Sequence, residues 1–498
     1  MWLNSRIDAF GRLGPKVKTL LLILMGLVAS LGQAPFGAVF LSLIGFASVF
    51  LVFSFAETGR AAAKMGWAFG LGYFVLTMQW LVSPFLVEAD RHGWMAPFAV
   101  VLLAGGLALL WGAAFAAARR FGPFALIVTL PLAELVRAYV FTGFPWGMPA
   151  YGLVDTIFAQ GAAWVGSHGL NVVLLALAYV LAWTVTGRGF AGWSWRLGLA
   201  AVAVTLIVPL KPMQATDDAA VIRLIQPNAP QHQKWDSAFM PIFFDRALAF
   251  TAAEGQPDLI LWPETSLPYS LPGGIDAVDE IAAAANGVPF VVGANRFDDL
   301  LLMNAAVLVD EAGQISQIYD KAHLVPFGEY MPFGEVLARF GIHGLAASEG
   351  RGFTPGAGAE LMDLGALGKA LPLICYEAVF PQDVGAYSER PDFLMQITND
   401  AWFGTFSGPY QHLVQAQMRA IEQGLPLVRA ANTGVSAMID ARGRVVDSLP
   451  LNEAGFLDVA LPPALPMTLY AKTGDWTVFL LLLAGYIGLW VRKRRESN

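Results

Sequence analysis

The chain has 498 residues, of which 56% are hydrophobic and only 14% are charged. A soluble domain has roughly 45–50% apolar and about 25% charged residues, so this composition excludes a wholly soluble protein. The formal net charge of -7 comes without a Lys/Arg-rich run with interleaved aromatics, which argues against a nucleic-acid-binding face. One cysteine among 498 residues excludes an internal disulfide and a cysteine-based metal cluster.

Apolar runs predict seven membrane-spanning helices before residue 212 and an eighth near the C-terminus. About 20 apolar residues are needed to cross the hydrocarbon core of a bilayer. The predicted spans cover residues 17–33, 36–55, 64–83, 95–118, 122–141, 157–187, 195–211 and 476–490. We therefore expect an α-helical membrane bundle of about eight transmembrane helices.

Basic residues predict the orientation of these spans, because cytoplasmic loops carry an excess of Lys and Arg. Five basic clusters fall on one side of the membrane if all eight spans exist: Arg6, Arg12, Lys16 and Lys18; Arg60 and Lys64; Arg119 and Arg120; Arg188 and Arg196; and Arg492, Lys493, Arg494 and Arg495. Both termini are then cytoplasmic. The expected domains are a membrane domain at 1–211, an extracytoplasmic domain at 212–470, and an eighth helix with a basic cytoplasmic tail at 471–498.

The segment 212–470 has the pattern of an α/β domain. Short apolar runs at 219–228, 258–265, 289–295, 304–310, 371–377 and 393–400 predict strands, and helices suit Ile275–Asn286 and Gln411–Gln423. The runs are apolar throughout, which is typical of strands buried on both faces. We therefore expect a layered α/β domain whose functional site lies where polar groups follow the strand ends.

Three strand-like runs end in groups that suit nucleophilic catalysis: "DLILWPE" in Glu264, "ISQIYDK" in Lys321 and "LPLIC" in Cys375. The thiolate is the reactive form of cysteine, a nearby cation favours it, and a carboxylate can carry its proton. A lysine with a backbone N–H, such as that of Tyr376, can stabilise an oxyanion. A buried, unreactive cysteine and two solvated charges remain the alternative, although a free thiol outside the cytoplasm risks oxidation.

The segments "LWPET", "YDKAHLVPFGEY", "LICYE" and "NDAWFG", in this order, resemble the nitrilase superfamily. With the flanking spans, "QPNAPQHQKWD" and "FTGFPWG", the chain is similar to the apolipoprotein N-acyltransferase family over essentially its whole length. The resemblance implies a nitrilase-like α-β-β-α sandwich that carries a Glu–Lys–Cys triad.

The resemblance assigns roles to individual residues. It implies Glu264 as general base, Lys321 as stabilising cation and Cys375 as nucleophile. The residues expected to support the site or bind substrate are Glu329, Tyr376, Glu377, Trp235, Trp402, Phe144 and Trp146. For several of these a plainer role stays open: Glu329 as a loop acceptor, Trp235 and Trp402 as core residues, and Phe144 and Trp146 as interface anchors of span five.

Two further features have a structural and a functional interpretation. Glu134 and Arg137 lie three residues apart within or near the end of span five. Intramembrane charges are often functional, but we favour a structural role, in which the pair neutralises itself or snorkels to the outer interface. Residues 330–346 combine apolar positions with few charges, which suits either an arm that enters the outer leaflet interface or a packed helix.

The resemblance also implies the reaction. A phospholipid, with phosphatidylethanolamine as the expected donor, would acylate Cys375, and the acyl group would pass to the N-terminal cysteine of a diacylated apolipoprotein. The expected location is the bacterial inner membrane, with the catalytic domain periplasmic and with no cofactor, metal or nucleic acid involved. Two rivals are a membrane-anchored amidase or nitrilase that uses water, and a transporter or receptor whose external domain only binds ligand.

Overall fold

The computed structural model describes residues 2–186, 210–334, 339 and 352–497. The chain forms two compact units. The first comprises Met1–Lys211, Phe406–Val414 and Thr468–Asn498, and the second comprises Pro212–Thr405 and Gln415–Met467. The segment Phe406–Val414 groups with the first unit. It contains the beginning of a helix, Gly408–Gln423, whose remaining residues belong to the second unit.

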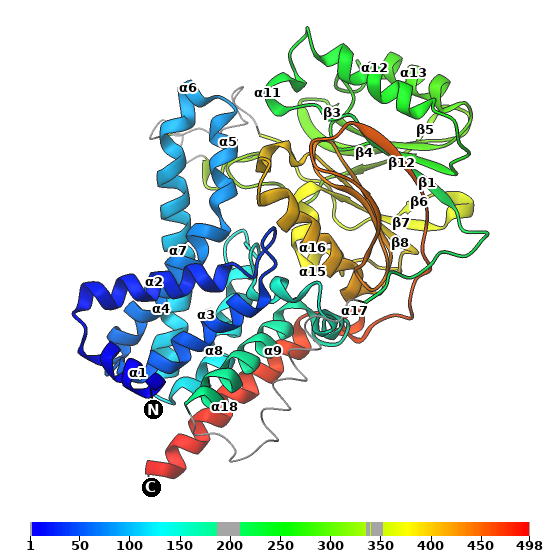
Figure 1. The fold of residues 1–498 in the computed structure, drawn as a ribbon. Coiled ribbons are helices and arrows are strands. Elements are labelled where there is room, and N and C mark those ends of the chain that lie inside the picture. The colour runs from blue at the N-terminus through cyan, green and yellow to red at the C-terminus, as the bar shows by residue number, and fades with distance from the viewer. Residues whose placement is uncertain (1, 187–209, 335–338, 340–351, 498) are drawn as a thin grey trace. The chain divides into compact units, whose positions relative to one another are not determined.

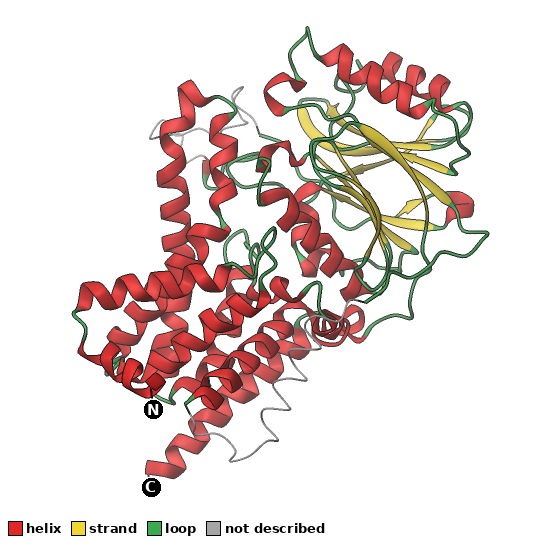
Figure 2. Ribbon diagram, in the orientation of Figure 1, coloured by secondary structure: helices red, strands yellow, loops and turns green. Residues whose placement is uncertain are grey.

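The described part of the first unit consists of helices joined by loops (Figures 1 and 2). Its helices are α1 Trp2–Arg12, α2 Pro15–Ser30, α3 Val39–Val52, α4 Gly59–Thr77, α5 Val82–Leu86, α6 Ala89–His92, α7 Ala96–Arg119, α8 Leu126–Tyr139, α9 Ala162–Val185, α17 Leu469–Thr473 and α18 Trp476–Ser497. Aromatic side chains hold the interior together. The Trp111 ring of α7 lies 4.9 Å from the rings of Tyr73 and Phe74 and 5.6 Å from that of Phe69, all on α4.

Three helices in the described residues are long and apolar enough to cross a membrane: Ala89–Arg119, Ile157–Val185 and Trp476–Glu496. A fourth span exists if Gly59–Thr77 and Gln79–Leu86, which meet at a bend of 57°, count as one. The 14-residue helices α3 and α8 reach only about 21 Å at 1.5 Å per residue, less than the hydrocarbon core of about 30 Å. The predicted total of eight spans therefore stays a prediction, and the seventh, at 195–211, lies almost wholly outside the described residues.

The described residues of the second unit form two six-stranded sheets. The strands are β1 Val221–Gln226, β2 Leu259–Leu261, β3 Phe290–Asp298, β4 Leu301–Val309, β5 Ile315–Asp320, β6 Met362–Asp363, β7 Lys369–Ile374, β8 Phe393–Thr398, β9 Leu427–Ala431, β10 Ser436–Ile439, β11 Val445–Leu449 and β12 Gly455–Ala460. The orders are β12-β1-β2-β3-β4-β5 and β11-β10-β9-β8-β7-β6. Strands β1-β2-β3 and β7-β8-β9 run parallel, while the outer pairs are antiparallel. Each of the six apolar runs predicted as a strand forms one.

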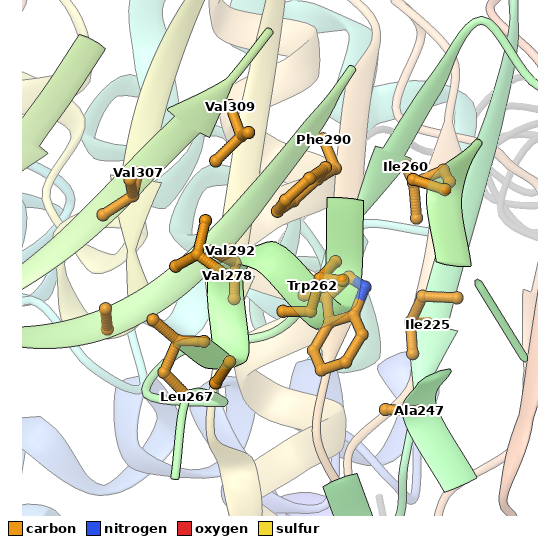
Figure 3. Packing of buried hydrophobic residues seen from close by; sticks show 14 of the residues in the cluster. Ile225, Ala247, Ile260, Trp262, Leu267, Val278, Phe290, Val292, Val307 and Val309 are labelled. Carbon is orange, nitrogen blue, oxygen red and sulfur yellow. The ribbon is translucent and has the colours of Figure 1, made fainter. Parts of the chain in front are cut away.

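Helices cover the outer face of each sheet (Figure 2). The α-helices in the described residues of this unit are α11 Gln231–Lys234, α12 Met240–Thr251, α13 Ile275–Ala285, α15 Pro381–Val384 and most of α16 Gly408–Gln423. Figure 3 shows the core between the first sheet and its helices, where Val278 of α13 packs with Trp262, Phe290 and Val292. Because β1 and β9 also contact across the two sheets, the predicted α-β-β-α sandwich is present, and its strand ends carry the candidate site.

Candidate active site

The three residues predicted as a catalytic trio each follow a strand. Lys321 comes directly after β5, Cys375 directly after β7, and Glu264 in the turn after β2. All three side chains are buried, with exposed fractions of 1%, 4% and 5%. They come from both sheets, because β2 and β5 belong to one sheet and β7 to the other.

Cys375 lies in a strained turn. Its φ is +52°, in the left-handed region that non-glycine residues seldom occupy, between β7 and a 3-10 turn at Cys375–Val379. Buried polar residues support this turn, since Gln396 donates to the Cys375 carbonyl at 3.2 Å and Arg429 donates to Gln396 at 2.5 Å. Backbone strain of this kind persists only where the surroundings hold it, and it is concentrated at functional sites.

A network of two carboxylates and one ammonium forms the centre of the site. Lys321 Nζ lies 2.8 Å from Glu329 Oε1 and 3.4 Å from Glu264 Oε1. The Asn304 side-chain amide donates to the same two oxygens, at 2.7 Å to Glu264 and 3.3 Å to Glu329. Backbone amides bind the other oxygen of each carboxylate, from Asn399 to Glu264 Oε2 and from Val325 to Glu329 Oε2, both at 2.8 Å. Hydrogen-bond donors therefore contact both oxygens of each carboxylate and fix its orientation.

These contacts determine the charges at the site. Burial by itself would lower the pKa of Lys321, but attraction to Glu329 and Glu264 outweighs it and raises the pKa above its usual value. Burial raises the pKa of the Cys375 thiol, and Glu264 raises it further, while Lys321 opposes the rise. At neutral pH the site therefore holds an ammonium and a protonated thiol, so the thiol must lose its proton as it attacks.

Glu377 joins the Cys375 turn to the segment that carries Lys321. Its Oε2 accepts from the Ile374 amide at 2.7 Å, and its Oε1 accepts from the Ala322 amide at 2.7 Å and the Tyr319 hydroxyl at 2.9 Å. Burial raises the pKa of Glu377, while the amide donors oppose that rise. With both oxygens occupied by such donors, this carboxylate fixes the loops.

The aromatic residues predicted at the site lie in different surroundings. Trp235 and Trp402 are 46% and 37% exposed, whereas Tyr376 is 4% exposed and its ring lies 4.9 Å from that of Phe380. Trp235 borders a small pocket of about 30 Å³, together with residues that include Lys234, Phe243, Trp262, Thr265 and Leu267. This pocket is the apolar recess that adjoins the Glu264 turn.

Phe144 and Trp146 belong to the first unit. Trp146 is fully buried, and its indole donates to Gln411 at 2.7 Å. Arg137 holds this loop by donating to the carbonyls of Phe144 and Trp146, and it also forms a buried ion pair with Glu134. The expected mutual neutralisation of Glu134 and Arg137 is thus present, and the pair also fastens the loop.

Sequence reasoning missed several polar residues that hold the site. They are Asn304, Asn399, Gln396, Arg429 and Lys234. Asn399 is part of the "NDAWFG" segment, and Lys234 is part of "QHQKWD", but neither was given a role. Most of the proposed arm at 330–346 lies outside the described residues. Among the described residues, no group of three His, Cys, Asp or Glu side chains is arranged to hold a metal ion.

The sandwich, with its buried cysteine and carboxylate–lysine network, is a domain of the carbon–nitrogen hydrolase class, as a matching family model shows. A family model described as carbon-nitrogen hydrolase matches residues 219–465, and one described as apolipoprotein N-acyltransferase N-terminal domain matches residues 25–180.

Relatives match along almost the entire chain. An apolipoprotein N-acyltransferase from Rhodopseudomonas palustris is 36% identical over 97% of this chain and 96% of its own length, and one from Sinorhizobium fredii is 37% identical over 93% and 94%. The chain belongs to the apolipoprotein N-acyltransferase family, and it is an acyltransferase. Among solved structures, a variant amidase from Nesterenkonia sp. AN1 with a covalent adduct on its active-site cysteine is 21% identical over 50% of this chain and 93% of its own, at a TM-score of 0.36.

Proposed function

We propose that the chain transfers a fatty acyl group from a membrane phospholipid, through a thioester on Cys375, to the α-amine of a diacylglyceryl-modified N-terminal cysteine on apolipoproteins. The observation that carries the proposal is the Glu264–Lys321–Glu329 network, which acts electrostatically on the Cys375 thiol. The names of the full-length relatives support lipoprotein N-acylation as the outcome.

The first half-reaction acylates the cysteine. The Cys375 sulfur attacks the ester carbonyl of the phospholipid while its proton passes to Glu264. A carbon–sulfur bond forms and the ester carbon–oxygen bond breaks, so that the lysophospholipid leaves with the proton from Glu264. Lys321, with the backbone N–H of Tyr376, stabilises the negative oxygen that develops at the carbonyl.

The second half-reaction consumes the thioester. The α-amine of the lipid-modified cysteine attacks the carbonyl of the thioester, and Glu264 takes a proton from the nitrogen. A carbon–nitrogen bond forms, the carbon–sulfur bond breaks, and the proton returns to the Cys375 sulfur. Glu264 thus acts as base and then as acid in each half-reaction.

The apolar helices of the first unit support a proposed lipid donor and a proposed membrane location. A diacyl lipid stays in the bilayer because each buried CH₂ contributes about 0.8 kcal/mol, so the thiol must work at a leaflet surface. We propose eight spans, cytoplasmic termini and a periplasmic catalytic domain in the bacterial inner membrane, supported by the basic residues beside the expected spans. Phosphatidylethanolamine is the proposed donor, and the exposed Trp235 and Trp402 of the second unit are the proposed contacts for acyl chains. In the first unit Phe144 keeps this proposed role, whereas the full burial of Trp146 suits a packing role.

An acyl-transfer assay tests the proposal. The full chain in phosphatidylethanolamine vesicles is incubated with a diacylated lipopeptide, and the N-acylated peptide and free fatty acid are quantified. We expect N-acyl peptide from the wild type and none from Cys375→Ser. A wild type that releases only free fatty acid would use water as the second nucleophile, as in the membrane-anchored amidase or nitrilase alternative, and full N-acylation by Cys375→Ser would refute Cys375 as the nucleophile.

A further inference from the structure

Lys234, at the end of α11, contacts the turn that carries Glu264. Its side chain is only 7% exposed. Its Nζ donates to the Glu264 carbonyl at 3.1 Å and to the Thr265 hydroxyl at 2.9 Å. Lys234 thus approaches the candidate general base from the backbone side, while Lys321 approaches it from the carboxylate side.

The turn that Lys234 contacts is strained. Thr265 has a φ of +47°, and a β-branched residue in the left-handed region is a genuine outlier. Such a conformation persists only where neighbouring groups hold it in place. The two hydrogen bonds from Lys234 end on the carbonyl before this residue and on its own side chain. They therefore fix the part of the chain that sets the direction of the Glu264 carboxylate.

The segment before Lys234 is itself tied to the site. Asn399, whose amide binds the Glu264 carboxylate, donates its side-chain amide to Gln231 Oε1 at 2.8 Å. Asn432 exchanges two hydrogen bonds with the backbone of Ala229, at 2.8 and 2.9 Å. Because α11 is fixed at several points, Lys234 presents its ammonium from a rigid support.

The charge of Lys234 lacks the compensation that Lys321 has. Among the described residues, no carboxylate oxygen lies within 4.0 Å of Lys234 Nζ, whereas Lys321 has two such partners. Burial lowers the pKa of Lys234 to about 8, against the attraction of Glu264 and of the Cys375 thiolate. A cation without a paired anion stabilises new negative charge more than a neutralised one does. Attack by Cys375 creates such charge, first on sulfur and then on the carbonyl oxygen.

We propose that Lys234 is a second positioning cation of the active site, which holds the Glu264–Thr265 turn and, in its charged form, favours acylation of Cys375. The inference rests on the proposed acyl-transfer function. Lys234 acts by holding the turn and through the electrostatic field of its ammonium group, without direct contact with the lipid. It is active only while protonated, so loss of its proton slows acylation.

The test measures the first half-reaction alone, so that titration of the acceptor amine plays no part. The full chain in phosphatidylethanolamine vesicles, without acceptor, is quenched at intervals between pH 6 and pH 10, and the rate of acyl addition to Cys375 is read by mass spectrometry. We expect the wild-type rate to fall as the pH rises above about 8. Lys234→Met should be slower on the order of 10²-fold at pH 7 and should lack the alkaline fall. Lys369→Met, a surface lysine paired with Glu389, is the matched control and should behave as wild type.

Other titrating groups around Lys234 do not imitate this profile. Glu264 and Cys375 face it, with Lys321 and Glu329 beyond Glu264. The pKa of Lys321 is raised, away from this range, and ionisation of the thiol would increase the rate instead of lowering it. Thr265→Val provides an independent variant, because loss of the hydroxyl acceptor favours neutral Lys234 and should move the alkaline fall to lower pH.

The outcomes separate the two proposals. If wild-type Cys375 gains no acyl group, the proposed function fails and this inference fails with it. If the wild type is acylated, three results overturn the role of Lys234 but leave the proposed function standing. The wild-type rate shows no fall at alkaline pH, or Lys234→Met has the same rate and pH profile as the wild type, or Lys234→Met is slow but its rate still falls at alkaline pH. If Lys234→Met does not fold, an unmoved profile in Thr265→Val overturns it.

Discussion

Gly293 of β3 packs so closely against the Glu264 turn that a single methyl group there should disable the site. A Cβ at this position would lie 2.4 Å from the Pro263 carbonyl oxygen and 2.5 Å from both Glu264 Cα and the Thr265 nitrogen. All three are backbone atoms, so no side-chain rotation relieves the contact. Gly293→Ala therefore forces the turn away from β3.

The required shift follows from the distances. The closest contact is about 1 Å short of the 3.4 Å at which ordinary van der Waals contact begins. Moving Glu264 by that amount breaks its 2.7 Å hydrogen bond from Asn304 and its 3.4 Å approach to Lys321. A misplacement of about 1 Å can cost on the order of 10²-fold in rate, and overpacking costs about 1–3 kcal/mol of stability.

The assay compares Gly293→Ala with Gly385→Ala in the same unit, where the nearest atom to the new Cβ is the Gln423 side-chain nitrogen at 3.5 Å. Acylation of Cys375 by phospholipid and the thermal unfolding midpoint are measured for both. We expect Gly293→Ala to lose about 10²-fold in rate and Gly385→Ala to match the wild type. A Gly293→Ala variant that acylates at the wild-type rate would refute the close packing of the turn.

The remaining predictions concern the charged groups of the site. Glu377→Gln replaces one accepting oxygen by an NH₂ group, so one buried backbone N–H loses its acceptor, at a cost of about 1–3 kcal/mol of folding stability. Both the unfolding midpoint and the acylation rate should fall. An unchanged midpoint would contradict the role of Glu377 in fixing the loops. Glu329→Gln removes the 2.8 Å ion-pair partner of Lys321 and lowers the pKa of that lysine, so acylation should slow and an unchanged rate would argue against the network. The pKa of Lys234 is about 8 in the folded protein and about 10.4 in an unfolded chain. Keeping this lysine charged in the folded state therefore costs about 3 kcal/mol of folding stability below pH 8, and this cost disappears above about pH 11. Two hydrogen bonds of about 1 kcal/mol each offset part of this. Lys234→Met should therefore unfold at or slightly above the wild-type midpoint at pH 7 and below it near pH 11. A midpoint well below wild type at pH 7 would contradict this balance.

Local sequence patterns were sufficient to predict the residues at the strand ends, but not the distant residues that form hydrogen bonds with them. Strand-like runs followed by Lys321 and Cys375 predicted the residues that come directly after β5 and β7. The β7 strand is buried, and a local hydrophobic run is enough to predict such a strand. The contact from Asn399 to Glu264 joins residues 135 positions apart, and that from Asn304 joins residues 40 apart. Such contacts depend on the order and register of strands, which no short window of sequence contains.

The helices of the first unit show the same limit. The run at 64–83 predicts one span, whereas the structure bends by 57° between Gly59–Thr77 and Gln79–Leu86. Hydropathy alone does not register a change of direction within an apolar segment. The run at 157–187 likewise contains a break, since Gly166 has a φ of +63° inside α9.

The most direct test of the central claim is the mass of the Cys375 peptide after incubation with phospholipid alone and again after addition of a diacylated lipopeptide. The proposed mechanism predicts that this peptide gains one fatty acyl group in a thioester bond, and that the group then moves to the amine of the lipopeptide in equal amount. Continued N-acylation without an acyl group on Cys375 at any stage would contradict it.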